Sequence, residues 1–124
     1  MSANELEARV RAICLALPEV TERLSHGSPA FYVAKQFVVL WTDGLHEHDF
    51  SHLWCAAAPG AQQELIAMAP ERVFRPPYVG ARGWIGVRLD EPADFDEIEM
   101  FVEDAYHSVA PKRQIALLDD ELSG

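Results

Sequence analysis

Basic side chains are scarce in this sequence. Its 124 residues hold 10 Lys and Arg against 20 Asp and Glu, which gives a formal net charge of −10 at pH 7. An acidic chain repels the phosphates of nucleic acids and of anionic membranes over a long range. No apolar run approaches the roughly 20 residues that a transmembrane helix needs, so we expect no association with a membrane.

Cysteine is almost absent. Cys14 and Cys55 form no CxxC pair and no Cys/His spacing typical of a zinc site. Each lies among apolar residues, which predicts two buried free thiols with a structural role. Reduced thiols of this kind suit a cytoplasmic protein.

Recognisable catalytic motifs are missing as well. The sequence contains no Walker loop, no GxGxxG, no GxSxG and no HExxH. Ser25-His26 and Ser51-His52 are sequence neighbours, and adjacent strand positions point to opposite faces, so neither pair predicts a nucleophile with its base. We therefore expect a non-enzymatic protein with no cofactor.

Helical periodicity is present at both ends of the chain and in its middle. Residues 2–17 begin with Ser2 and Glu5 at capping-box spacing, and residues 94–109 begin with Asp94 and Glu97 in the same way. The apolar stripes that predict these two helices are Leu6, Val10, Ile13, Cys14 and Leu17 in the first and Ile98, Phe101, Val102, Ala105 and Val109 in the second. Shorter helices are expected over residues 60–69 and, as a final helix or a frayed tail, over residues 112–122.

Strand signals occupy the space between the helices. Before the middle helix the sequence predicts strands over residues 30–33, 37–41 and 51–57, with residues 19–25 an edge strand or an irregular link. The expected connections are a turn at 26–29, a tight link at 34–36, a turn at 43–44 and a loop at 45–49. After the middle helix follow a short strand over 73–75 and the clearest strand, over 83–89. In that strand Ile85, Val87 and Leu89 should face the core, and Trp84, Gly86 and Arg88 the other side.

This order of elements predicts one α+β domain over residues 1–124. Its core would span about residues 4–113, with 114–124 as a C-terminal helix or tail. Meandering strands with helices at the ends favour a two-layer sandwich, in which the N-terminal, middle and C-terminal helices pack on an antiparallel sheet of about five to six strands.

Residues 71–90 are the one stretch whose charge clearly opposes that of the chain. They hold four arginines against Glu71 and Asp90, a local charge of +2. Arginine binds phosphate or carboxylate through paired N–H donors, and exposed aromatic rings can stack on bases. The candidate DNA- or ligand-binding residues are Arg75, Tyr78, Arg82, Trp84 and Arg88. The structural alternative is that the arginines pair with nearby acids and that Trp84 belongs to the core.

Two further clusters have the composition of metal sites. His46, His48 and His52 alternate as an extended segment would require, and imidazole suits zinc and other transition metals. Their spacing matches no standard site, and a solvated loop accounts for it. The carboxylates of residues 91–104 include several at the start of a helix, where the helix dipole favours them. We assign a metal to neither cluster.

The ordered set of motifs resembles a known family. Cys14-Leu15-Ala16-Leu17-Pro18 ends the first helix, the run 27–33 reads GSPAFYV, Pro59-Gly60 opens a helix, and Pro77-Tyr78-Val79-Gly80 precedes Trp84 and a strand. Over about residues 4–113 this pattern is similar to the MmcQ/YjbR family. The resemblance implies a two-layer fold of the CyaY, frataxin-like kind and a DNA-binding role.

Three functions remain open on this basis. The first is non-enzymatic binding of double-stranded DNA by the Arg/aromatic stretch. The second is a module for a small molecule or small anionic ligand on the exposed sheet face, in a pocket lined by Tyr32, Trp41, Trp84 and Arg88. The third is a protein-interaction or homodimerisation domain that uses the same aromatic face, so that the chain is either a monomer or a homodimer.

Overall fold

A six-stranded antiparallel sheet forms the centre of the molecule. The structure is a computed structural model that describes residues 2–42, 50–90 and 94–123. The strands are β1 (Thr21–Ser25), β2 (Ser28–Val33), β3 (Lys35–Trp41), β4 (His52–Cys55), β5 (Val73–Phe74) and β6 (Ile85–Arg88). They are ordered β1-β2-β3-β4-β6-β5, and every neighbouring pair is antiparallel. The predicted α+β class and sheet size are confirmed.

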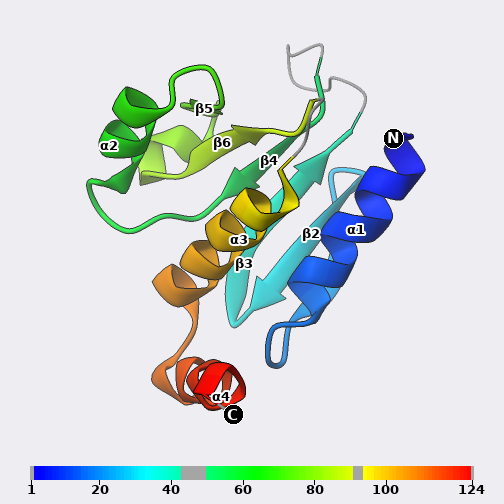
Figure 1. Ribbon diagram of the computed structural model, residues 1–124, viewed down its shortest axis with the longest axis vertical. Helices are drawn as coiled ribbons and strands as arrows, with labels where there is room; N and C mark the ends of the chain where they lie inside the picture. The colour runs from blue at the N-terminus through cyan, green and yellow to red at the C-terminus, as the bar shows by residue number, and fades with distance from the viewer. Residues whose placement is uncertain (1, 43–49, 91–93, 124) are drawn as a thin grey trace.

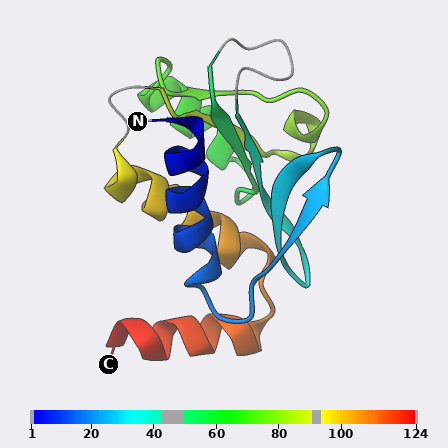
Figure 2. The same ribbon diagram turned by 90° about the vertical axis from the view of Figure 1, so that its right-hand side faces the viewer.

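Four α-helices accompany this sheet within the described residues (Figure 1). They are α1 (Ala3–Leu15), α2 (Ala61–Met68), α3 (Phe95–Val109) and α4 (Lys112–Ser123), and a 3₁₀ helix, η1 (Val79–Arg82), precedes β6. Helices α1 and α3 lie side by side on one face of the sheet (Figure 2), while α2 lies next to β5 at the end of the sheet (Figure 1). No helix in the described ranges is long and apolar enough to cross a membrane.

Both long helices begin where the capping residues predict. The Ser2 hydroxyl accepts a hydrogen bond from the backbone N–H of Glu5 at 3.2 Å, and Asp94 accepts from the N–H groups of Asp96 and Glu97 at 3.1 and 3.2 Å. These bonds satisfy donors that a helix start leaves without partners. Most of the predicted stripe is buried, namely Leu6, Val10, Cys14, Leu17, Ile98, Phe101, Val102 and Ala105.

The face of the sheet under α1 and α3 holds most of the core. Its central side chains are mainly aliphatic, and Val38, Leu40, Leu53, Ile85 and Val87 are all almost fully buried there. Cys55 of β4 shares this face with its partner Val38, and Cys14 of α1 is buried in the same core. Burial raises the pKa of the Cys14 thiol well above its ordinary value, and the nearby Cys55 raises it further. Burial raises the pKa of Cys55 to about 12. Both are free thiols, as predicted.

A β-bulge at Phe37 sorts the residues of β3 between the two faces. Tyr32 pairs with Gln36, but the preceding residue Phe31 pairs with Val38, so Phe37 has no partner of its own. Its ring packs edge-on against Tyr106 of α3, with the ring centroids 5.8 Å apart. A bulge resets the alternation of a strand. Gln36, Val39 and Trp41 consequently share the side of the sheet that faces away from α1 and α3, which we call the open face.

Two connections are shorter than the sequence suggests. The turn expected at 26–29 consists only of His26 and Gly27, because Ser28 already pairs with Ser25. Both turn residues have positive φ, 52° and 81°, as the two-residue turns that match the twist of a hairpin require. The link expected at 34–36 is reduced to Ala34, at φ 64°, because Lys35 pairs with Val33. The turn and loop predicted at 43–49 lie outside the described residues.

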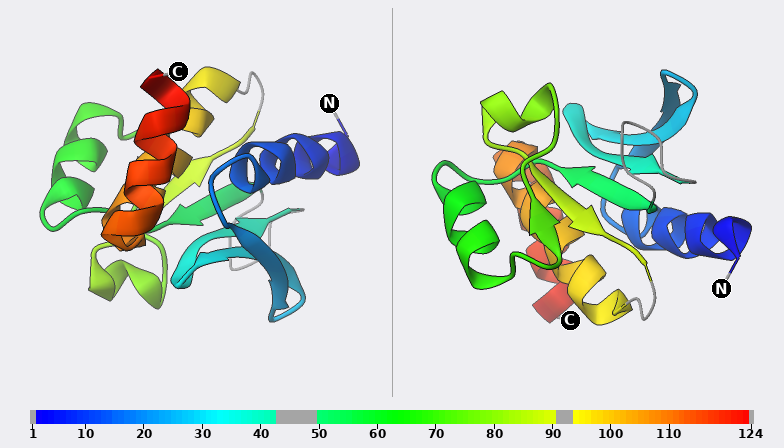
Figure 3. Two further views of the ribbon diagram at one scale, coloured as in Figure 1. Left: turned by 90° about the horizontal axis from the view of Figure 1, so that it is seen from below. Right: turned by 90° about the horizontal axis from the view of Figure 1, so that it is seen from above.

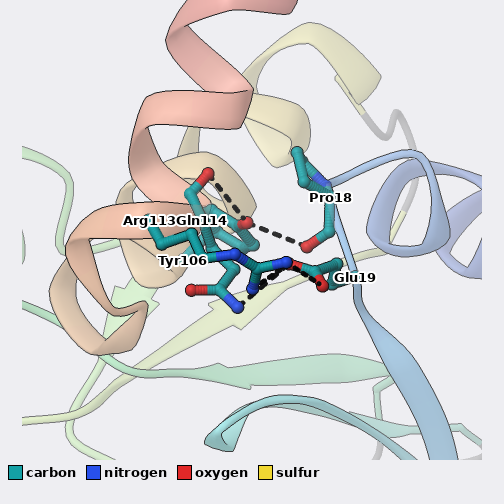
Figure 4. Close-up of polar contacts among 5 residues, drawn as sticks. All are labelled: Pro18, Glu19, Tyr106, Arg113 and Gln114. Carbon is teal, nitrogen blue, oxygen red and sulfur yellow. Dashed lines mark hydrogen bonds and ion pairs between the residues drawn. The ribbon is translucent and has the colours of Figure 1, made fainter.

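Helix α4 crosses the end of the helix layer, as the view from below shows (Figure 3). Its attachment joins three distant segments (Figure 4). The buried hydroxyl of Tyr106 donates to the carbonyl of Pro18 at 2.9 Å and lies 3.3 Å from that of Gln114. Glu19 receives both guanidinium N–H groups of Arg113, at 3.0 and 3.1 Å. Of the two alternatives for the C-terminal segment, the structure has the helix, and Leu118 buries its side chain against the core.

Candidate functional site

The open face of the sheet is aromatic at its centre. Trp41 of β3 and Trp54 of β4 lie with ring centroids 4.8 Å apart and a 57° angle between the ring planes. Both are almost completely buried, with 3% and 5% of their surface exposed, although neither α1 nor α3 covers this side. The sheet places them together because Val39 pairs with Trp54 and Trp41 with His52.

A cavity of about 660 Å³ lies over these two indoles. Its residues come from the β1–β2 turn, from β3 and β4, and from the segment around η1: Ser25, His26, Gln36, Val39, Trp41, Trp54, Tyr78 and Val79. We call it the aromatic cavity. Its volume falls in the range of roughly 300–1,000 Å³ that is usual for small-molecule sites, and its mostly apolar lining with a few polar groups is usual too.

Tyr78 forms one rim of the aromatic cavity in a strained backbone conformation. Its φ and ψ are 61° and −73°, and the N–H of Val79 donates to the carbonyl of Pro77 at 2.7 Å. These are the features of a γ-turn of the rare type with positive φ. A non-glycine residue in such a region costs of order 1–3 kcal/mol, and strain of this kind clusters at ligand sites. The turn leaves 79% of the Tyr78 side chain exposed.

A buried glutamine holds this rim in place. The side-chain NH₂ of Gln62 in α2 donates to the carbonyl of Gly80 at 2.9 Å and to that of Trp84 at 2.6 Å. On the other side of the turn, the aliphatic stem of Arg75 covers Gly80, where an added Cβ would lie 2.8 Å from Cγ of Arg75. The strained turn is thus fixed from both sides. Periodicity could not find Gln62, since the helix pattern marks Leu65 and Ile66 as the inward residues and both are only partly buried.

Beyond Trp54 the aromatic row continues along the open face. His52 lies 6.4 Å from Trp54 and 5.6 Å from Phe74 between ring centroids. Phe50 lies within 6 Å of both His52 and Phe74. Phe74 lies directly over Gly86, where an added Cβ would come within 2.4 Å of its ring. Glycine is therefore the residue that lets β5 place an aromatic ring flat on β6.

The five residues predicted as a DNA- or ligand-binding set do not form one cluster. Arg88 donates twice to Asp90, at 3.1 and 2.8 Å, and its guanidinium lies 3.8 Å from the ring centroid of Phe50. The pKa of Asp90 is lowered chiefly by these hydrogen bonds. Only 6% of the surface of Trp84 is exposed, so this ring offers no open face for stacking on a base. Tyr78 and Arg75 are exposed on the segment before η1.

The remaining member, Arg82, lies at a second and smaller hollow. Its guanidinium is 5.0 Å from the ring centroid of Trp84. The hollow has a volume of about 380 Å³ and is lined by Lys35, Gln36, Arg82, Trp84 and Val109. We call it the basic hollow. Of the predicted pocket residues, Trp41 lines the aromatic cavity, whereas Trp84 lines the basic hollow and Tyr32 hydrogen-bonds Gln36, whose side chain reaches both spaces.

Of the three histidines in the predicted cluster, the structure describes only His52. His46 and His48 lie outside the described residues. His52 is fully buried in β4, and its Nδ1 lies 3.0 Å from the carbonyl oxygen of Phe50, which makes that nitrogen a hydrogen-bond donor. Across the described ranges, no three His, Cys, Asp or Glu side chains are grouped as metal ligands.

Comparison with known proteins places the chain in a family. The sequence model of the YjbR family matches residues 15–108, well over half of the chain. This chain belongs to the YjbR family. The resemblance seen in the sequence motifs is thereby confirmed. The match ends before α4, so the helix fastened by Tyr106 and Glu19 lies beyond the family region.

A solved structure shares the fold of this YjbR protein. It is a crystal structure of the Deinococcus radiodurans protein DR2400, with the domain DUF419. The two superpose with a TM-score of 0.65 at 19% sequence identity, over 92% of this chain and 85% of that one. At this identity the similarity shows the fold alone. No curated protein matches the sequence.

Proposed function

We propose that this YjbR protein is a non-enzymatic binding protein that takes a small molecule with a flat apolar or aromatic body into the aromatic cavity. The observation that carries the proposal is the pairing of that cavity with a strained rim. Trp41 and Trp54 form an apolar floor, and the γ-turn at Tyr78 holds a third aromatic side chain at the edge. The exposed ring of Tyr78 can stack on a flat ligand, and the two nearly buried indoles give that ligand an apolar surface beneath it, so the cavity favours a planar guest.

The absence of an activated nucleophile among the described cysteines supports a binding rather than a catalytic role. Cys14 and Cys55 are both buried, and burial raises the pKa of each. The thiolate is the reactive form of cysteine, and a raised pKa disfavours it. The polar groups at the cavity are Ser25, His26 and Gln36, which can orient a ligand by hydrogen bonds.

The test is a titration with N-phenyl-1-naphthylamine, an uncharged aromatic probe whose fluorescence rises in apolar surroundings. We expect saturable one-to-one binding, accompanied by a change in tryptophan emission, because two of the three tryptophans line the cavity. Ser25→Phe should block binding, since this half-buried residue lines the cavity.

Thr21→Phe is the matched control for this titration. Thr21 lies four residues before Ser25 on the same side of β1 but outside the cavity lining, so this variant should bind the probe as the original chain does. Absence of saturable binding by the folded protein, or equal loss in both variants, would overturn the proposal.

Binding of double-stranded DNA is a second candidate, and the exposed arginines favour it. No ion pair involves Arg75 or Arg82 in the described part of the chain, whereas Arg72 pairs with Glu97 at 2.6 Å and Arg88 with Asp90. DNA binding by a few such contacts must weaken steeply with salt. Fluorescence anisotropy of a labelled duplex should then show binding at about 50 mM salt that is lost at about 200 mM. Binding that survives in Arg75→Ala/Arg82→Ala, or none at low salt, would remove this candidate.

A further inference from the structure

The aromatic cavity and the basic hollow share a wall. Gln36 of β3 lines both, and η1 separates them, because Val79 at its start lines the cavity and Arg82 at its end lines the hollow. A molecule bound over Trp41 and Trp54 therefore lies one side chain away from the hollow.

The two cations of the basic hollow lie close together without a carboxylate partner among the described residues, unlike four arginines elsewhere in this acidic chain. Four arginines are engaged by carboxylates, in the pairs Arg11–Glu22, Arg72–Glu97, Arg88–Asp90 and Arg113–Glu19. Lys35 and Arg82 are both exposed, and within the described residues neither forms an ion pair. With a net charge of −10, carboxylates are plentiful, so two cations at one hollow without a carboxylate partner mark a place where an anion is favoured.

The geometry of Arg82 is suited to binding an anion. The central carbon of its guanidinium lies 5.0 Å from the ring centroid of Trp84, within the range of a cation–π contact. The N–H donors lie in the plane of the guanidinium and point outward from its edge, in the fork that matches carboxylate and phosphate. Trp84, held by burial and by the bond from Gln62 to its carbonyl, gives the arginine a fixed base.

We propose that the ligand of the aromatic cavity carries an anionic group, a carboxylate or a phosphate, which binds Arg82 and Lys35 in the basic hollow. This inference rests on the proposed function, since it assigns the second half of the same ligand. The ligand is then an amphipathic aromatic acid. Its flat body lies on the indoles, and its anionic group lies beyond Gln36, where it contacts the two cations.

The experiment measures how well naphthalene derivatives displace N-phenyl-1-naphthylamine. The competitors are 1-naphthyl phosphate, 1-naphthoate and the uncharged 1-naphthalenemethanol. We expect at least one of the two anions to compete about tenfold better than the alcohol at about 50 mM salt, which is the effect of one or two charge-assisted hydrogen bonds, and to lose most of that advantage at about 200 mM. The comparison of phosphate with carboxylate identifies which anion the hollow prefers.

Charge-removing variants locate the effect. In Lys35→Gln/Arg82→Gln the anions and the alcohol should compete equally to within about twofold, while the affinity for the uncharged probe stays unchanged. Arg9→Gln/Lys112→Gln is the matched control, because it removes the same charge from exposed residues that line neither the aromatic cavity nor the basic hollow, and it should keep the preference.

The outcomes separate this inference from the proposed function. If the probe binds but anions and alcohol compete equally in the original chain, or if the control variant loses the preference as fully as the hollow variant, the anionic group is wrong and the aromatic cavity stands. If the folded protein does not bind the probe at all, both proposals fail.

Discussion

The two faces of the sheet bury their residues in different ways. Under α1 and α3 the side chains are mainly aliphatic and are covered by helices with regular stripes. On the open face the central residues are aromatic, and the walls around them are a two-residue turn and a 3₁₀ helix. The first face has the layered packing of an ordinary core. The second borders a partly open cavity of about 660 Å³. Under the proposed function, stability is concentrated on the helix-covered side of the sheet and ligand binding on the open face.

The largest expected effect comes from adjacent residues of β4 that point to opposite faces. Leu53→Ala should lower the free energy of unfolding by about 3 kcal/mol, because a fully buried leucine leaves a void under the helices. Trp54→Leu should cost roughly 1–2 kcal/mol, since leucine still covers part of the apolar surface. Urea unfolding with an unchanged m-value measures both.

Ligand binding should respond in the opposite order. Leu53→Ala should leave the affinity for N-phenyl-1-naphthylamine unchanged, whereas Trp54→Leu should lose it. Equal effects of the two variants on stability and on affinity would show that the two faces do not divide these roles.

The next largest effect concerns the close contact between β5 and β6 on the open face. Gly86→Ala should destabilise the protein by about 2 kcal/mol, because the new methyl group would overlap the ring of Phe74. In a chain that already carries Phe74→Ala, the Gly86→Ala change should leave the free energy of unfolding nearly unchanged. A Gly86→Ala variant with an unchanged urea midpoint would show that the Phe74 ring can move away, and that this end of the open face is loosely packed.

On the helix side, Tyr106→Phe should cost about 1 kcal/mol at neutral pH, the usual value of one hydrogen bond. Burial raises the pKa of Tyr106 above its ordinary value of 10.0, so the folded state holds the phenol proton more tightly than the unfolded state. The stability that this supplies is complete below about pH 10 and is lost as the pH rises beyond it.

The measurement is urea unfolding of both proteins from pH 7 to pH 11. The original chain should lose more stability than Tyr106→Phe above about pH 10, so that the gap between them narrows. A constant gap would mean that the hydroxyl does not titrate differently in the folded state.

The smallest effect should have the opposite sign. Tyr78→Gly should raise the free energy of unfolding by up to about 1 kcal/mol, because glycine relieves the positive φ at a modest cost in chain entropy. The same change should weaken probe binding several-fold. Gly27→Ala is a useful contrast, since it introduces strain at φ 81° and should only destabilise. A loss of stability in Tyr78→Gly would show that the tyrosine side chain contributes more than its backbone strain costs.

The helix-covered face could be predicted from the sequence, because its signals are local. Capping residues and the apolar stripe placed the two long helices, and alternation in β6 placed Ile85 and Val87 inward. Membership of the YjbR family was also foreseen from ordered motifs, while the cytoplasmic location, the oligomeric state and DNA binding remain predictions.

The candidate site was predicted only in fragments, because it depends on contacts between distant residues. The sequence pointed to Trp41 and Tyr78 but not to Trp54 or Gln62, which the structure places at the cavity and behind its rim. The bulge at Phe37 decides that Gln36 and Val39 share a face, and no sequence pattern in β3 marks it. The burial of Trp84 and the pairing of Arg88 with Asp90 agree with the structural alternative that the sequence had left open for these residues.

The unequal edges of the sheet limit how a second copy of the chain could extend it. β5 has only two residues and so offers almost no backbone for pairing with a further strand, whereas β1 has five. Within β1, Glu22 forms an ion pair with Arg11 of α1 at 2.7 Å. A sheet continued across two molecules must therefore join β1 to β1. An antiparallel pair of identical strands is related by a twofold axis and closes on itself, so growth along the sheet would end at twelve strands, two copies of six. The two-residue β5 thus leaves an edge too short for open-ended growth along the sheet.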